Sequence, residues 1–202
     1  MRLEKVPDSF DNLANLKNLL LKGCKILIEL PVDFGKLQAL RVFNLENCVR
    51  LEKLPNSFLK LATLKKLLLN GCTDLIELPV EFGNLQALEL LDLENCVRLE
   101  KVPNSFANLA NLEIFCSKGC DNLIELPVKF GNLHALEILD LSKCVRVEKL
   151  PNSFAKLATL KTLWLEGCTD LIELPVEFGS LQALEVLIPQ VGNFEEAFVE
   201  WV

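Results

Sequence analysis

Eight cysteines and one histidine are the residues of this sequence that could support nucleophilic or metal-binding chemistry. A thiolate beside an imidazole is the pairing of cysteine-dependent hydrolases, and both side chains are common zinc ligands. Cys116 and His134 are the candidates for such a pair, but we expect them on opposite sides of the fold. Cys116-x-x-x-Cys120 also lacks the paired spacing and partner ligands of a zinc site. We therefore expect no catalytic residue, no metal and no cofactor, and a protein that is not an enzyme.

The spacing of the cysteines indicates a structural role. Seven of them recur at intervals of 24 residues: Cys24, Cys48, Cys72, Cys96, Cys120, Cys144 and Cys168. Disulfide frameworks of small secreted domains have irregular spacings. A cysteine that returns to the same place in an apolar repeat is typical of a reduced, buried, small hydrophobic residue. Together with the lack of an N-terminal signal peptide, this predicts a cytoplasmic or nucleo-cytoplasmic protein.

The prolines show the same period and define the unit that positions these residues. They occur at Pro7, Pro31, Pro55, Pro79, Pro103, Pro127, Pro151 and Pro175. The common frame is Leu-x-x-Leu-x-x-Leu-x-Leu-x-x-Cys-x-x-Leu-x-x-Leu-Pro-x-x-Phe. This is the pattern of a leucine-rich repeat, with Cys in the place often held by Asn.

Changes of spacing within one unit predict its shape. Leu91 and Leu93 are two residues apart, as on one face of a strand. Leu85 and Leu88 are three apart, which suits a tight or helical turn, and Pro79 cannot donate to a strand ladder. Because one such coil cannot cover its own core, coils must stack. We expect an α/β-type solenoid: a leucine-rich-repeat horseshoe of about eight 24-residue coils, with a parallel concave sheet and short or helical turns on the convex side.

A second period of 48 residues overlies the first. Odd units contain Pro-Asn-Ser-Phe, as at 103–106, and even units contain Pro-Val-x-Phe-Gly, as at 127–131. Such similarity favours recent tandem duplication or a consensus design.

The two ends of the chain depart from the repeat. Residues 1–188 are predicted to form the solenoid, and 189–202 a C-terminal capping segment, because Pro189 cannot belong to a central strand. Asn193 and Glu196 resemble a capping box, and Phe194, Phe198 and Trp201 would share one helical face. The chain begins inside a coil, so we expect it to be a fragment of a longer protein.

One position inside the array breaks the leucine column. Ser117 stands where other coils have Leu93 or Leu141. A one-residue slip would bury Cys116 instead, but Phe115 and Cys120 hold the frame on both sides. We expect no slip, and we expect coil five to be the weakest coil, since loss of a buried leucine costs about 2–5 kcal/mol.

The formal net charge of −7 argues against binding of nucleic acid or of an anionic membrane. Outward-facing strand positions are the candidate protein-binding surface. The residues assigned to it are Lys17, Lys22, Arg41, Asn44, Lys66, Leu68, Asp92, Glu94, Cys116, Asp140, Trp164 and Glu166. Charge is segregated along this face, basic in coils one to three and acidic in later coils, which can orient a partner. Neutral drift at exposed positions explains the variation of these residues equally well.

The step Gly-Cys-Thr-Asp-Leu-Ile-Glu-Leu-Pro at 71–79 and 167–175 resembles the repeats of plant intracellular immune receptors, in particular the TIR-class nucleotide-binding leucine-rich-repeat proteins. The resemblance extends to about Leu187. It implies a sensor module, monomeric when isolated, whose partners are pathogen effectors, host guardees or other domains of a parent receptor. The chain contains no P-loop and no TIR-like segment. The alternatives are a cytosolic leucine-rich-repeat signalling scaffold, or a duplicated or designed array with no dedicated partner.

Overall fold

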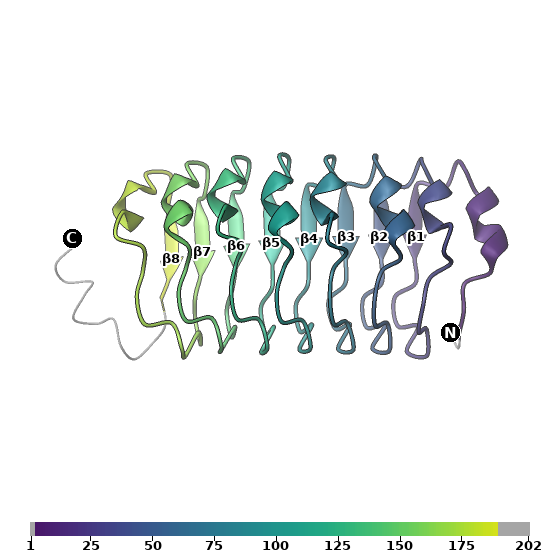
Figure 1. The fold of residues 1–202 in the computed structure, drawn as a ribbon, viewed down its shortest axis with the longest axis horizontal. Helices are drawn as coiled ribbons and strands as arrows, with labels where there is room; N and C mark the ends of the chain where they lie inside the picture. The colour runs from purple at the N-terminus through teal and green to yellow at the C-terminus, as the bar shows by residue number, and fades with distance from the viewer. Residues whose placement is uncertain (1–2, 190–202) are drawn as a thin grey trace.

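The protein is described by a computed structural model that covers residues 3–189 (Figure 1). Eight three-residue strands form one parallel sheet in chain order. The strands are β1 (Asn18–Leu20), β2 (Val42–Asn44), β3 (Lys66–Leu68), β4 (Leu90–Asp92), β5 (Ile114–Cys116), β6 (Ile138–Asp140), β7 (Thr162–Trp164) and β8 (Val186–Ile188). Each residue pairs with the one 24 positions later, as in Leu67 with Leu91. The predicted solenoid of eight coils is confirmed, and the coils are numbered here by their strands.

A short 3-10 helix precedes each strand, and Figure 1 shows these turns as a second row along the molecule. They are η1 (Asp8–Asn12), η2 (Phe34–Lys36), η3 (Asn56–Lys60), η4 (Phe82–Asn84), η5 (Asn104–Asn108), η6 (Phe130–Asn132), η7 (Asn152–Lys156) and η8 (Phe178–Ser180). The predicted helical turns on the convex side are therefore present. Among residues 3–189, no helix is long and apolar enough to cross a membrane.

The Pro-x-x-Phe step explains these turns. The amide of Phe106 donates to the carbonyl oxygen of Pro103 at 2.9 Å, and the same bond recurs in every coil. The phenylalanine ring is thereby directed into the core, where rings of successive coils stack. The Phe106 and Phe130 ring centroids, for example, lie 6.1 Å apart.

The core is one continuous column of apolar side chains. Leu91 and Leu93 are fully buried, as their two-residue spacing predicts, since both point inward. Ser117 is also fully buried, while Cys116 remains on the sheet face. The register across coil five is therefore unbroken and the expected absence of a slip is confirmed. The predicted capping helix lies outside the described residues.

The repeated cysteines connect the coils. From the second coil to the seventh, each of these thiols donates to a backbone carbonyl of the preceding coil: Cys48 to Leu21 at 3.2 Å, for example, and Cys168 to Leu141 at 3.0 Å. Burial raises the pKa of Cys72 and of Cys144 to about 12. These thiols therefore stay protonated and act as buried donors, which confirms the structural role that their spacing predicts.

The 48-residue period has a physical basis at the junction of each even coil with the next odd coil. The amide of Gly131 donates to Oγ of Ser153 at 3.0 Å. A Cβ atom added at Gly131 would lie 1.7 Å from the carbonyl oxygen of Ser153. Equivalent pairs join Gly35 to Ser57 and Gly83 to Ser105. Only glycine permits this approach of two backbones. The serine hydroxyl of the odd unit accepts the glycine amide, so the Phe-Gly and Asn-Ser-Phe units meet as pairs.

Candidate functional site

The concave face of the sheet contains four side-chain columns, which begin in coil one at Lys17, Asn18, Leu20 and Lys22. All twelve residues predicted for a protein-binding surface lie in these columns and are exposed or half-buried. Lys17 and Arg41 belong to the first column and Lys66 to the second. The third contains Asn44, Leu68, Asp92, Cys116, Asp140 and Trp164, and the fourth contains Lys22, Glu94 and Glu166. The fold thus brings them together on one surface, and their role in binding stays a prediction.

Three of the twelve have an internal role that the sequence analysis missed. Oδ1 of Asn44, Asp92 and Asp140 accepts the amide of the residue two positions later, at 2.8, 2.9 and 2.8 Å. These bonds shape the turns that follow β2, β4 and β6. The turn then reaches a left-handed residue, which is Asn47, Asn95 or Lys143 in even coils and glycine in odd coils. The sequence contained a signal for these turns, since even units have Asn or Asp at the end of the strand and odd units have Gly-Cys in the turn.

Ion pairs between neighbouring coils neutralise part of the face. Lys22 pairs with Glu46 at 2.8 Å, Lys118 with Glu94 at 3.4 Å and Lys161 with Glu137 at 2.9 Å. Lys65 pairs with Glu89 across the boundary between coils three and four. Exposed pairs of this kind contribute little to stability, but they reduce the charge available to a partner.

The charges that remain are separated by sign. In coils one to three, Lys17, Arg41 and Lys66 form no ion pair with a described residue. In coils four to eight the same is true of the acidic residues Asp92, Glu113, Asp140, Glu166 and Glu185. It is also true of the cation Lys143, which lies in the turn after β6 and outside the four columns. The change of sign lies between Lys66 of β3 and Asp92 of β4. The predicted charge segregation is present after internal pairing.

One acidic cluster lies near the centre of the face. A carboxylate oxygen of Asp92, one of Glu94 and the Cys116 thiol lie within 4.8 Å of one another. Burial raises the pKa of Asp92, and the negative charge of Glu94 adds to this effect. Burial, followed by the carboxylates of Asp92 and Asp140, raises the pKa of Cys116 to about 12. The ammonium of Lys118 already balances Glu94, and a protonated thiol is a poor metal ligand.

The high pKa of Cys116 also makes this thiol a weak nucleophile, because the thiolate is the reactive form. His134 is exposed and follows η6, in a segment of coil six distinct from the strand that carries Cys116. Its sister residues Gln38 and Gln86 donate to backbone carbonyls of the next coil, at 3.0 and 2.9 Å. In the related coils, the residue equivalent to His134 therefore has a structural role, because it links its coil to the next one.

Apolar side chains interrupt the charged columns at two places. Leu20 is 66% exposed near the first edge of the sheet. Trp164 is half-buried at the end of β7, where its register partner on β6 is Asp140. Large aromatic side chains commonly contribute much of the energy of a protein interface.

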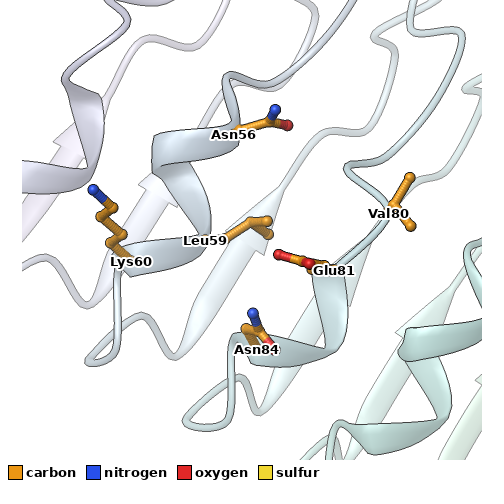
Figure 2. A pocket seen from close by; sticks show the side chains of 6 residues that line it. All are labelled: Asn56, Leu59, Lys60, Val80, Glu81 and Asn84. Carbon is orange, nitrogen blue, oxygen red and sulfur yellow. The ribbon is translucent and has the colours of Figure 1, made fainter.

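The convex side offers a different surface. A depression of about 470 Å³ lies between η3 and η4. Figure 2 shows the side chains that line it, which are Asn56, Leu59, Lys60, Val80, Glu81 and Asn84. Val80 is 80% exposed and belongs to a row with Val32, Val128 and Val176. An exposed asparagine separates each pair of valines along this row, as Asn104 does between Val80 and Val128. Scattered apolar residues of this kind are normal on protein surfaces.

Comparison with known proteins agrees with this geometry. A family model described as Leucine Rich Repeat matches residues 135–157. The leucine-rich repeat domain of the type III effector XopL superposes with a TM-score of 0.71 at 24% identity, over 94% of this chain and 73% of that one. This chain has the fold of a leucine-rich-repeat solenoid.

Two structures of complexes share the fold of the leucine-rich-repeat solenoid over longer chains. The plant peptide hormone receptor RGFR1 in complex with RGF2 has a TM-score of 0.56 at 26% identity, over 87% of this chain and 34% of that one. The Drosophila Toll–Spatzle complex has a TM-score of 0.57 at 23% identity, over 93% of this chain and 28% of that one. The solenoid thus spans about a third or less of these two chains. No curated protein matches its sequence.

Proposed function

We propose that this leucine-rich-repeat solenoid is a protein-recognition module that binds its partner through the concave face. The observation that carries this proposal is the surface itself, an eight-stranded sheet face that no other described helix or strand covers, with segregated charge and a half-buried Trp164. Two of the similar structures are complexes, one of a plant peptide hormone receptor with RGF2 and one of Toll with Spatzle. The finer proposal is the sensor part of a cytoplasmic plant immune receptor that recognises pathogen effectors, and it rests on the Gly-Cys-x-x-Leu-x-x-Leu-Pro resemblance.

Proximity labelling in plant cells tests the proposal. The concave variant combines Trp164→Ala, Lys66→Glu and Glu113→Lys, which leaves net charge unchanged and spares the internal bonds of Asp92 and Asp140. The convex control combines Val80→Ala, Lys60→Glu and Glu81→Lys, which matches it in charge and also truncates one exposed apolar side chain. Circular dichroism verifies that both variants fold.

The concave variant should lose specific partners that the convex control keeps. For an isolated partner, Trp164→Ala alone should weaken binding by about 2 kcal/mol or more. Equal losses from both variants, or an unchanged partner set, would reject the concave face as the binding surface. Partners unrelated to defence, or a parent gene without a nucleotide-binding domain, would favour the alternative of a general signalling scaffold.

A further inference from the structure

We infer that the concave face selects a partner segment whose charges are themselves segregated, with carboxylates over coils one to three and lysine or arginine side chains over coils four to eight. The inference rests on the proposed function, since it specifies the chemistry of the protein bound at that face. It follows from the charged side chains of the face that form no ion pair with a neighbouring coil.

The basic end consists of side chains that point to solvent. Lys17, Arg41 and Lys66 are all exposed, and none pairs with a described carboxylate. The nearest acidic residues of the face, Glu46 and Glu89, are already paired with Lys22 and Lys65. A partner carboxylate is therefore the counterion that this end lacks.

The acidic end has more charged residues without an ion pair than the basic end has. Asp92, Glu113, Asp140, Glu166 and Glu185 stand without an ion pair among the described residues. Asp140 uses one oxygen for an internal amide, which leaves its second oxygen for a ligand. The carboxyl group of Asp92 accepts an internal amide and also hydrogen-bonds the Cys116 thiol. The raised pKa of Asp92 and of Cys116 reflects burial together with the negative field of this region. A partner cation would relieve that repulsion.

Trp164 specifies where one cation would lie. Asp140 and Trp164 are register partners on adjacent strands, which are about 4.8 Å apart in a sheet. A guanidinium or ammonium group above this pair would meet a carboxylate and the face of an indole together, and indole is the best aromatic partner for a cation. Neither residue forms an ion pair or ring contact with a described residue.

The length of the face limits the size of the segment. Eight strands at a spacing of about 4.8 Å span roughly 35 Å. An extended peptide covers that distance with about 11 residues. A segment with both kinds of charge needs only one change of sign along it, above the boundary between Lys66 and Asp92.

Two fluorescent peptides of about 12 residues and identical composition test the inference. One has its glutamates in one half and its lysines in the other, and its isomer has the two residue types interleaved. Anisotropy titrations at low ionic strength should show the block peptide binding about 10-fold more tightly, because only its charges match both ends of the face. The preference should decline as added salt screens it.

Matched variants assign the preference to this face. Two concave variants should each abolish most of the preference for the block peptide. One neutralises the basic end with Lys17→Gln/Arg41→Gln/Lys66→Gln, and the other neutralises the acidic end with Asp92→Asn/Glu113→Gln/Asp140→Asn. Two convex variants with the same change of charge should retain it, and they are Lys60→Gln/Lys129→Gln/Lys156→Gln and Asp8→Asn/Glu81→Gln/Glu177→Gln.

Equal affinity for both peptides, no measurable binding of either, or a preference that survives concave neutralisation would overturn the inference. Sedimentation velocity gives a separate outcome. A dimer that the concave neutralisations dissociate would assign the face to a second copy of this chain and overturn the partner proposed here. If Trp164→Ala removes cellular partners while the peptides show no preference, protein recognition stands and the charge rule fails. A block preference without any partner loss in cells would instead reject the proposed function.

Discussion

The backbone of Gly83 touches the next coil at Ser105: a Cβ atom added to this glycine would lie 1.8 Å from the Ser105 carbonyl oxygen. Gly83→Ala should therefore force the fourth and fifth coils apart on the convex side. Overpacking of this kind typically costs about 1–3 kcal/mol. Urea unfolding should show the loss, and the adjacent exposed variant Asn84→Ala should unfold like the parent. A Gly83→Ala protein of unchanged stability would show that the two coils are not held at this distance.

Lys143 has a left-handed backbone, with φ of 61°, in the position that odd coils give to glycine. Left-handed backbone costs a non-glycine residue about 1–2 kcal/mol. Lys143→Gly should thus raise the free energy of unfolding by up to about 1 kcal/mol. Lys143→Val should lower it, because β-branched residues fit this conformation worst. Thermal unfolding of the two variants decides the matter, and the reverse order of stability would contradict the assigned turn.

Ser117 is fully buried in a column that leucine fills in neighbouring coils. Its Oγ lies 3.8 Å from the Cys144 sulfur, and 3.5 Å from the Asp140 carbonyl oxygen. Because Leu93 and Leu141 occupy the same place on the same backbone, Ser117→Leu should stabilise coil five by about 1–2 kcal/mol. Leu93→Ser is the reciprocal control and should destabilise its coil by about 2–5 kcal/mol. Native-state hydrogen exchange at coil five should slow in Ser117→Leu, and faster exchange there would show that the site is too small for leucine.

Asp92 should make stability depend on pH. Burial raises the pKa of this carboxyl group above its usual value, so the folded state holds the proton more tightly than the unfolded chain. The resulting stability is present below the unfolded pKa of about 4 and is lost as pH rises through the folded pKa. At neutral pH the charged Asp92 therefore opposes folding.

Asp92→Asn should stabilise the protein at pH 7, by less than about 1 kcal/mol after solvent screening. The amide of Asn44 shows that asparagine makes the same turn bond, at 2.8 Å. The gain should disappear below pH 4, and Glu81→Gln on the convex side should give no comparable change. Urea unfolding at several pH values measures both, and a gain independent of pH would show that removal of charge is not its cause.

Much of the fold could be predicted because each coil is defined by local spacing. Leucines two apart must point to one side of a strand, and Pro-x-x-Phe closes a turn through a bond from the Phe106 amide to the Pro103 carbonyl. A period of 24 residues then leaves stacking as the only way to bury the leucines. The same alternation placed the candidate residues on the outer face of the sheet.

The sequence by itself thus determined the repeat, the inward leucines, the buried cysteines and the surface on which charges gather. Only the tertiary structure decided which charged side chains form ion pairs within the protein. Lys65 and Glu89, for example, pair because the stacking of coils three and four brings their side chains together. It also decided that Asp92 and Asp140 each give one oxygen to their own turns. Local spacing fixes the direction of a side chain, whereas contacts between coils depend on how closely two backbones approach. The distance between the backbones of Gly83 and Ser105 is set by the packing of two coils, and it cannot be read from the sequence of one repeat.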